Sequence, residues 1–303
     1  MAATETVTLA AGDLEARFAP EAGMVGCSLR HRGEELLGLR GGVEDYLARG
    51  KTFGIPLLHP WANRLGAWEY AVAGRRVTLD RDSRLLRPDE HGLPIHGALP
   101  AGARWRVVQA TREALSAELD WAADTGRMAL FPFAHVVELR AVLDGGVLRI
   151  ETTIAATGDE PVPLAYAFHP YLAPPGAPRE RWEVELPAMA HMALDDRGLP
   201  TGAREPQAAE RFALADRHYD DAFALDEGAP QAEFAVSDGT RRMAIAFERG
   251  FPYAQVFAPP EPRVICFEPM TAPVDALRTH AGLRCVDPGE RATAAFAVHV
   301  QDA

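Results

Sequence analysis

The sequence lacks several features that mark membrane, secreted or nucleic-acid-binding proteins. No apolar stretch reaches the roughly 18 residues that a membrane-spanning helix needs, and the N-terminus has no basic start followed by an apolar run. Basic residues are scattered rather than gathered into a block, and the formal net charge is -12. This acidic balance disfavours nucleic acid and anionic membrane surfaces as partners. We therefore expect a cytoplasmic protein that binds neither.

Cysteine and glycine motifs of known chemistry are also missing. Cys27, Cys266 and Cys285 are odd in number, widely spaced and outside any CxxC pair. This pattern favours neither a disulfide framework nor a structural zinc site, so we expect three small buried hydrophobic side chains. No glycine-rich phosphate loop follows a strand pattern, which removes support for a dinucleotide-binding unit.

The sequence does contain short segments in which apolar and polar residues alternate, separated by turns that contain glycine. "ELRAVLDGGVLRIETTI" and "EFAVSDGTRRMAIAF" each carry apolar alternation into an Asp-Gly turn and out again, which predicts two antiparallel hairpins. "DLEARFAP", "WEYAVAGRRVTLD" and "TAAFAVHV" predict further strands. Helix patterns are confined to "GVEDYLARG" and "APVDALRTH". These patterns indicate an all-β fold, a large antiparallel β-sandwich with a few short helices.

The domain organisation follows from length and composition. The chain has 303 residues, of which 48% are hydrophobic and 24% charged, enough to bury a large core. It shows no long Ser/Gly linker, internal repeat or low-complexity tract. We expect one domain over residues 1–303. The Pro-rich stretches "LAPPGAP" and "FAPPEP" predict loops at strand ends, where functional sites are common.

Polar residues that could carry chemistry gather in four segments, "GIPLLHPWANRLG", "HGLPIHGALP", "AYAFHPYLAPPG" and "VICFEPMTAPVDAL". In the first, Arg64 lies in an apolar loop, where its guanidinium loses hydration unless it finds a partner. Its fork of donors suits a polyhydroxylated ligand or a carboxylate, and bracing of its own loop through backbone carbonyls is an equal alternative.

The histidines admit several interpretations. His91 and His96 are five residues apart, and a single pair of this kind is weak evidence for a metal site. His169 follows an apolar run, where burial would lower its pKa and a neighbouring carboxylate would raise it. Such an imidazole could transfer protons, and a core histidine bonded to backbone is the competing interpretation.

Glu268 is the most unusual residue of the fourth segment. It follows the apolar run "VICF" and precedes a proline, which predicts an extended carboxylate that caps the end of a strand. Desolvation there would raise its pKa and make it a better general base, whereas a Glu bonded to backbone N–H groups or an arginine would be inert. Asp220 and Asp221 in "YDDAFAL" could bind hydroxyls or form an exposed acidic turn.

Taken in order, these segments resemble the aldose 1-epimerase family, also called galactose mutarotases. "GIPLLHPWANRLGAWEY" is similar to the family's Asn-Arg segment, "PIHGALP" to its His-Gly segment, "FHPYLAPPG" to its His-Pro-Tyr segment and "ICFEPMTAPVDAL" to its Glu-Pro-Met-Thr segment. With weaker matches in "YDDAFAL" and "FPYAQVFAP", the resemblance runs collinearly from about residue 54 to 277. The opening "LEARFAPEAGMVGCSLRHRGEELL" is similar to the family's first strands.

The resemblance implies a β-supersandwich that interconverts the α and β anomers of a free aldose without a cofactor or metal. His169 would be the general acid and Glu268 the general base. The residues implied to hold the sugar are Arg64, His96, Asp220, Asn63 and Gln255. The partner would be a small monosaccharide, and we expect a monomer or homodimer.

One position departs from the family pattern, and other functions stay open. Family members often have Phe before the Pro-Trp of the first segment, where this chain has His59, so the shape of the sugar pocket can differ.

A non-catalytic sugar-binding protein of the same fold is one alternative. A metal-dependent enzyme that uses His91, His96 and Glu268 is a second. A hexose-6-phosphate 1-epimerase is a third, since scattered arginines could bind a phosphate, although the acidic net charge argues weakly against it.

Overall fold

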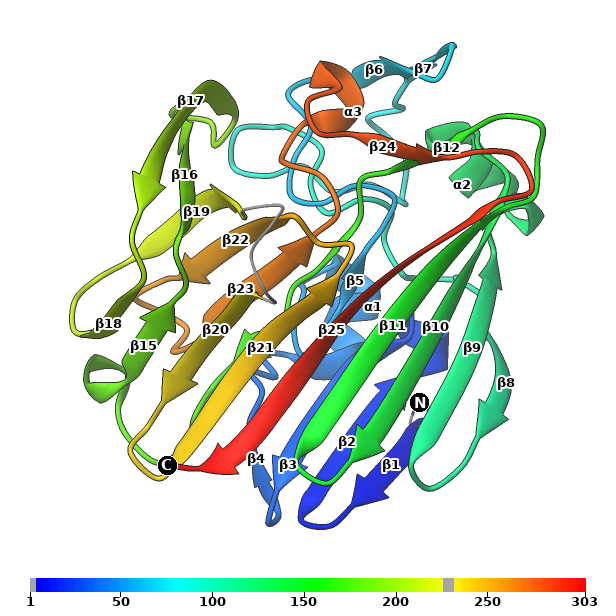
Figure 1. Cartoon of the computed structure of the whole chain (residues 1–303). Helices are drawn as coiled ribbons and strands as arrows, with labels where there is room; N and C mark the ends of the chain where they lie inside the picture. Colours follow the sequence, from blue (N-terminus) through cyan, green and yellow to red (C-terminus); the bar gives the residue numbers. More distant parts are fainter. Residues whose placement is uncertain (1–3, 226–231) are drawn as a thin grey trace.

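The computed structural model describes residues 4–225 and 232–303, which form two large antiparallel sheets and smaller sheets and helices around them. A nine-stranded sheet crosses the whole molecule (Figure 1). Its strands, in spatial order, are β18 (Glu210–Ala213), β15 (Glu183–Leu186), β20 (Ala232–Ser237), β21 (Arg241–Arg249), β25 (Arg291–Asp302), β11 (Val147–Ala156), β10 (His135–Asp144), β9 (Ala114–Asp120) and β8 (Arg106–Ala110).

An eight-stranded sheet packs against one half of the first. Its strands, in order, are β17 (Pro200–Gln207), β16 (Met189–Leu194), β19 (Tyr219–Ala224), β22 (Tyr253–Ala258), β23 (Ile265–Met270), β13 (Ala167–Phe168) and β5 (Leu57–Leu58), with β14 (Tyr171–Leu172) paired to β23 beside β13. All of these pairs are antiparallel.

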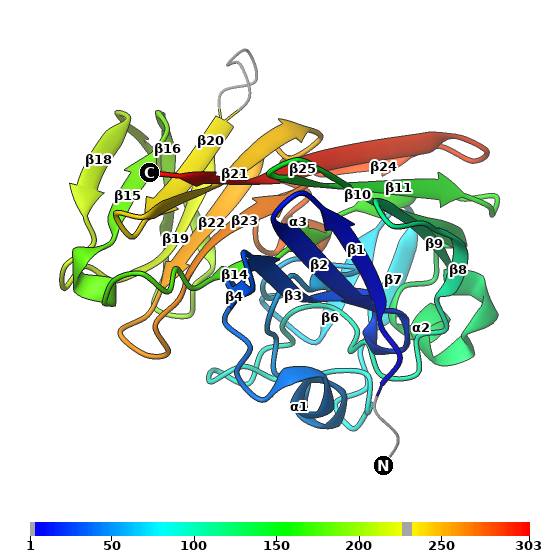
Figure 2. The ribbon, with the colours of Figure 1, turned by 90° about the horizontal axis from the view of Figure 1, so that it is seen from below.

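A four-stranded sheet contacts the other half of the nine-stranded sheet through β9 and β10. It consists of β1 (Val7–Ala11), β2 (Leu14–Ala19), β3 (Val25–His31) and β4 (Glu34–Glu35). Figure 2 shows this small sheet beneath the long strands, with α1 (Gly42–Arg49) farther out. The remaining elements are the pairs β6 (Glu69–Val72) with β7 (Arg75–Thr78) and β12 (Val162–Leu164) with β24 (Arg284–Val286), the helices α2 (Thr125–Leu130) and α3 (Ala276–Thr279), and the 3-10 turns η1 (Pro20–Ala22), η2 (Trp121–Ala123) and η3 (Arg179–Arg181).

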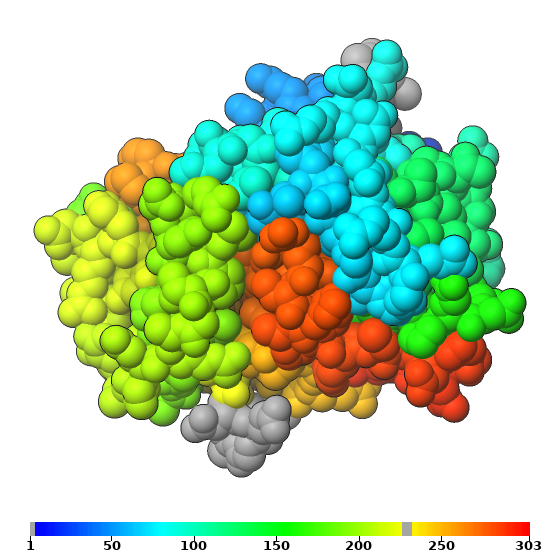
Figure 3. All heavy atoms as spheres, turned by 90° about the horizontal axis from the view of Figure 1, so that it is seen from above, coloured from blue at the N-terminus to red at the C-terminus, as the bar shows by residue number. Residues whose placement is uncertain are grey.

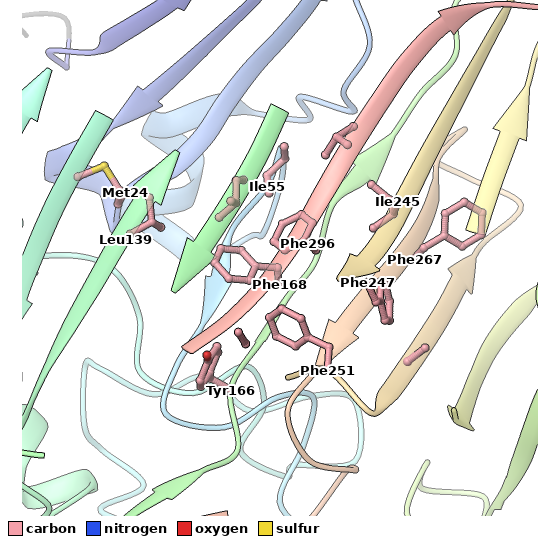
Figure 4. Close-up of a cluster of buried hydrophobic side chains, with 14 of the residues drawn as sticks. Met24, Ile55, Leu139, Tyr166, Phe168, Ile245, Phe247, Phe251, Phe267 and Phe296 are labelled. Atoms are coloured by element: carbon pink, nitrogen blue, oxygen red, sulfur yellow. The ribbon is translucent and has the colours of Figure 1, made fainter. Parts of the chain in front are cut away.

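The core between the two large sheets is rich in aromatic side chains (Figure 4). Phe267 of β23 lies 5.5 Å, centroid to centroid, from Phe234 of β20, and Phe168 lies 5.0 Å from Phe296 of β25. All four are fully buried. Truncation of a buried Phe to Ala typically costs about 3–5 kcal/mol, so these contacts hold the two sheets together.

The expected fold class is confirmed, and most of the predicted elements are found. Both Asp-Gly hairpins form, as β10–β11 and β20–β21. "GVEDYLARG" forms α1, whereas "APVDALRTH" gives only the four-residue α3. Both Pro-rich stretches form loops beyond β14 and β22. The prediction of three buried cysteines is confirmed only for Cys266. Cys27 is half-buried, and Cys285 is exposed because β24 belongs to a two-stranded sheet at the surface.

Membrane-spanning helices are not found among the described residues, because none of their helices has the length and apolarity to cross a bilayer.

Candidate active site

Glu268 and His169 are brought together by the register of the eight-stranded sheet. On β23, Met270 pairs with Ala167 of β13 and Cys266 pairs with Tyr171 of β14. Continuing this antiparallel register places His169, between β13 and β14, directly opposite Glu268. Residues opposite one another on neighbouring strands point to the same face of the sheet. Accordingly, His169 Nε2 lies 3.2 Å from Glu268 Oε1.

The prediction that Glu268 caps a strand end is wrong, because β23 runs from Ile265 to Met270 and includes it. Pro269 lies inside the same strand, opposite Ala254 of β22. On the other side of β23, residues 267–269 face the gap between β13 and β14, where the ladder has no pairs. Proline lacks a backbone N–H. It is tolerated in a strand at a position where the neighbouring strand offers no carbonyl to accept a hydrogen bond.

The strand pleat separates the core from the site. Phe267 points into the core between the sheets, so its neighbour Glu268 points to the opposite face (Figure 4). Gln255 pairs with Glu268, and Asp220 of β19 pairs with Phe257 two residues farther along β22. These side chains therefore share one face across three neighbouring strands.

Asp220 and Asp221 have different environments. Asp220 Oδ1 accepts a hydrogen bond of 2.7 Å from Gln255 Nε2, and Asp220 lines the cavity described below. Asp221 faces the other way, where its Oδ1 lies 3.0 Å from His191 Nε2. Burial raises the pKa of Asp220. The residue that directly follows the aromatic is thus the one at the cavity, and Gln255 orients its carboxylate.

Two loops cover this face of the sheet and are joined by backbone hydrogen bonds. The amide of His96 donates to the carbonyl of Asn63 at 2.7 Å, and the amide of Leu65 donates to that of Pro94 at 3.0 Å. Asn63 and His96 have positive φ angles of 47° and 65°, a region that non-glycine residues rarely occupy. Such conformations cluster at functional sites and need a surrounding structure that holds them.

Arg64 is fixed by carboxylates and by a close backbone contact. Its Nε lies 2.8 Å from Asp89 Oδ2, and its Nη2 donates to Glu90 Oε1 at 3.4 Å. Asp89 is buried, whereas the side chain of Glu90 is 68% exposed. A Cβ atom on Gly198 would collide with Arg64 Nη1, so only glycine fits in the turn between β16 and β17. These contacts hold the Arg64 guanidinium in place as a hydrogen-bond donor at the cavity.

These side chains line one cavity of about 220 Å³. Its lining residues are Arg40, Thr52, Asn63, Arg64, Arg87, Glu90, Ile95, His96, His169, Tyr171, Asp220, Phe257 and Glu268. The covering loops, around residues 60–100, lie beside the segment of α3 on the face shown in Figure 3.

Several buried polar atoms of the cavity have no hydrogen-bond partner among the described residues. They are Asn63 Oδ1, Arg87 Nε, His96 Nδ1 and His169 Nδ1. Buried polar atoms normally find a partner, and leaving one unpaired costs about 1–3 kcal/mol. Unpaired donors and acceptors around one cavity suit a polar ligand.

Burial shifts the pKa values of both Glu268 and His169, which face each other in the cavity. Burial raises the pKa of Glu268 well above its usual range, and the charge of Asp220 raises it further, while Arg64 acts in the opposite direction. Burial lowers the pKa of His169 to about 3, and the charge of Arg40 lowers it too. Of the two effects expected on the pKa of His169, burial is the one that the structure shows. Burial therefore favours the uncharged pair, a protonated Glu268 and a neutral His169.

Two hydroxyl groups, linked by a hydrogen bond, also reach His169. Thr52 Oγ1 lies 2.6 Å from Tyr171 Oη, which lies 3.2 Å from His169 Nε2. The Tyr171 and His169 rings stack with centroids 4.2 Å apart. Burial raises the pKa of the Tyr171 hydroxyl, so it keeps its proton. This stack fixes the plane of the imidazole.

His59, the departure from the family pattern, does not line the cavity. Its Nε2 lies 2.9 Å from His135 Nε2, in a buried cluster with Trp121 and Phe131. His135 Nδ1 lies 2.6 Å from the carbonyl of Phe133 and so donates to it. Its Nε2 is then the acceptor for the N–H of His59. The substitution changes the core below the loops rather than the cavity wall.

Two other sequence candidates lie outside the cavity lining. His91 is at the surface, 3.7 Å from Glu90, and is not brought together with His96 and Glu268. Across residues 4–225 and 232–303, no group of three or more His, Cys, Asp or Glu side chains is arranged to hold a metal ion. Gln255 is buried beneath Asp220 rather than exposed to the cavity.

The lining residues that sequence reasoning missed include Arg40, Arg87 and Tyr171. Tyr171 belongs to the His-Pro-Tyr segment and could have been found there. Arg87 precedes Pro88, seven residues ahead of the His-Gly segment, and Arg40 lies in a glycine-rich turn before α1. No local pattern marks either arginine, because only the fold brings these loops to the cavity.

Comparison with solved structures shows the same fold in other proteins. A galactose mutarotase-like protein from Clostridium acetobutylicum is 18% identical, with a TM-score of 0.84 over 98% of this chain and 95% of that one. A protein from Synechocystis sp. PCC 6803 is 23% identical, with a TM-score of 0.77 over 100% and 99%. A galactose 1-epimerase from Lactobacillus acidophilus is 16% identical, with a TM-score of 0.72 over 98% and 94%.

Sequence comparison identifies the family. No curated protein sequence matches the chain. The family model for aldose 1-epimerase matches residues 7–299, nearly the whole chain and all the loops and strands of the cavity. The chain belongs to the aldose 1-epimerase family.

Proposed function

We propose that this protein interconverts the α and β anomers of an aldose by acid–base ring opening and reclosure. The observation that carries the proposal is the pair Glu268 and His169, 3.2 Å apart in a polar cavity and both nearly inaccessible to solvent. Mutarotation needs one group that removes a proton and one that delivers a proton, held together on a sugar. This pair meets that need without a cofactor.

The chemistry follows from the cyclic hemiacetal. Glu268 removes the proton of the C1 hydroxyl while His169 delivers a proton to the ring oxygen, and the C1–O5 bond breaks to give the open-chain aldehyde. Rotation about C1–C2 presents the other carbonyl face. Closure then runs the same proton transfers backwards, so the pair returns to its starting state.

This assignment requires one proton to move when the sugar binds. The free site favours a protonated Glu268 and a neutral His169, because burial disfavours both charges. Transfer of that proton across the 3.2 Å gap gives a carboxylate base and an imidazolium acid. The hydroxyl of Tyr171 is within 3.2 Å of the same imidazole nitrogen and can orient it during the transfer.

The remaining polar residues hold the sugar hydroxyls. Arg64 and His96 contact them from the loops, and Asp220 contacts them from β19. Asn63, whose side-chain oxygen Oδ1 has no partner among the described residues, is a further contact. Gln255 acts through Asp220 and is a positioning residue.

Exchange between anomeric proton signals, measured by NMR over a panel of aldoses, tests the proposal. Glu268→Gln and His169→Asn should each lower the exchange rate by roughly 10²–10⁴-fold, the usual contribution of a positioned proton transfer. Asp221→Asn is the matched control, because it removes a carboxylate beside the cavity that faces His191.

Two results would contradict the assignment. Exchange at the wild-type rate in either pair variant, with an unchanged unfolding curve, excludes that residue as an acid or base. Sugar binding without any acceleration of exchange identifies a sugar-binding protein instead of an enzyme.

A further inference from the structure

The cavity contains two arginines that the proposed acid–base chemistry does not use. Arg40 and Arg87 line it, and neither forms an ion pair with a carboxylate among residues 4–225 and 232–303. Arg64, in the same cavity, is neutralised by Asp89 and Glu90. Neither arginine is therefore neutralised by a direct ion pair, although the nearby and largely exposed Glu90 offsets part of the charge of Arg87.

Arg87 is held where its charge is costly. The residue is half-buried, and its Nε has no hydrogen-bond acceptor among the described residues. Burial lowers the pKa of its guanidinium, and the nearby charge of Arg40 adds to this effect. Two like charges that repel each other at the wall of a cavity are stabilised by an anion bound between them.

Arg40 is fixed on the histidine side of the cavity. Its guanidinium carbon lies 4.7 Å from the centroid of the Tyr171 ring, and its Nη1 donates to the carbonyl of Thr52 at 3.3 Å. The Tyr171 ring stacks on His169. The φ angle of Arg40 is 45°, so its backbone, like that of Asn63 and His96, occupies the left-handed region.

The charges of the cavity are divided between its two ends. Arg40 lies over the Tyr171 ring, which stacks on His169, whereas Gln255, opposite Glu268 on β22, donates a hydrogen bond to Asp220. In keeping with this arrangement, the charges of Arg40 and Arg87 lower the pKa of His169, and the charge of Asp220 raises that of Glu268. In a pyranose, C5 is bonded to the ring oxygen and carries C6, while the C1 hydroxyl is on the other side of that oxygen. If His169 serves the ring oxygen and Glu268 the C1 hydroxyl, the C6 substituent lies at the end occupied by the two arginines.

We propose that Arg40 and Arg87 form an anion subsite, and that the substrate is an aldose with an oxyanionic group, a phosphate ester or a carboxylate, at C6. This inference rests on the proposed anomerisation and specifies its substrate class. Arginine binds both groups through paired, charge-assisted hydrogen bonds. The subsite would select substrates and take no part in proton transfer.

Exchange spectroscopy at anomeric equilibrium can test the subsite without isolating pure anomers. The substrates are glucose and galactose, their 6-phosphates, and the corresponding uronates. We expect kcat/KM for one anionic class to exceed that for the neutral sugar by at least tenfold, since a hydrogen bond to a charged group changes affinity by about 10–100-fold. The class that is preferred, ester or carboxylate, identifies the source of the anion.

Arginine variants test the assignment to residues. Arg87→Gln and Arg40→Gln should each lower the ratio of kcat/KM for the anionic sugar to kcat/KM for the neutral sugar by about tenfold or more. Arg84→Gln is the matched control, because it removes an exposed positive charge from the same loop outside the cavity lining.

The outcomes separate the two proposals. If neutral aldoses are exchanged as fast as anionic ones, or if the variants affect both classes equally, the subsite is refuted and the anomerisation stands. If no aldose of any class is exchanged faster than in buffer, the proposed function fails and the subsite inference fails with it.

Discussion

The buried histidine pair below the loops makes the stability of this protein depend on pH. His59 and His135 are both fully enclosed, and burial is the main cause that lowers their pKa values, to well below the usual range for His59 and to about 4 for His135. Both are therefore neutral in the folded protein at pH 5. In the unfolded chain they take up protons with a pKa of about 6.5. Stability is thus fully present above pH 6.5 and is lost as the pH falls below it.

The size of the effect at His59 can be worked out at pH 5. Because its folded-state pKa is well below the usual range, only the unfolded chain binds the proton there, and the cost depends on the unfolded value alone. The distance from pH 6.5 to pH 5 is about 1.5 pKa units at about 1.4 kcal/mol each, which gives about 2 kcal/mol. His135 adds a similar loss, since its pKa of about 4 also lies below pH 5.

The variant that isolates this effect is His59→Phe, which places an aromatic ring among Trp121, Phe131 and Tyr166. Urea unfolding of both proteins at pH 8, 7, 6 and 5 gives the free energy of unfolding at each pH. We expect the wild type to lose about 2 kcal/mol more than the variant between pH 8 and pH 5. His218→Gln, at an exposed histidine, is the control. A difference that stays constant across this range would refute the reasoning.

Further predictions concern the cavity and the core. Asp220→Asn should lower kcat/KM about tenfold, whereas Asp221→Asn should leave it within about twofold, as measured by anomeric exchange. Gly198→Ala should raise KM because its methyl group displaces Arg64, with the unfolding curve as the check on the fold. Phe267→Ala should lower the free energy of unfolding in urea by about 3–5 kcal/mol, because it opens a void between the sheets. Since burial lowers the pKa of His169, the proposed general acid, to about 3, the exchange rate should show no inflection near pH 6.5. A step there would contradict the proposed protonation of the pair.

The local features of the fold could be predicted from the sequence. Alternation of apolar and polar residues together with Asp-Gly turns predicted the hairpins β10–β11 and β20–β21. A hairpin depends only on the residues of its two strands and its turn, so a local pattern is enough. The apolar run before Glu268 predicted desolvation, which raises its pKa in the structure. The order of segments predicted the family.

Features that depend on pairing between distant strands could not be predicted. Nothing local shows that Glu268 lies inside β23, because the gap that accommodates Pro269 is created by β13 and β14, about a hundred residues earlier in the chain. The same holds for the partner of His59, since β10 brings His135 to it. The choice between Asp220 and Asp221 depends on which face of β19 is turned to the cavity, which the structure decides through Gln255.

The placement of Glu268 and His169 on the sheet, with the arginines on loops, divides the site into two parts that can change independently. The spacing between the carboxyl and the imidazole is set by the pairing of β23 with β13 and β14 on either side of His169, so it stays the same when the loops vary. Arg40, Arg64 and Arg87 lie outside the named strands, where insertions and substitutions are tolerated best. A new sugar specificity can therefore be reached by changing loops alone, and engineering of this protein should alter residues around the cavity rim while leaving β22 and β23 untouched.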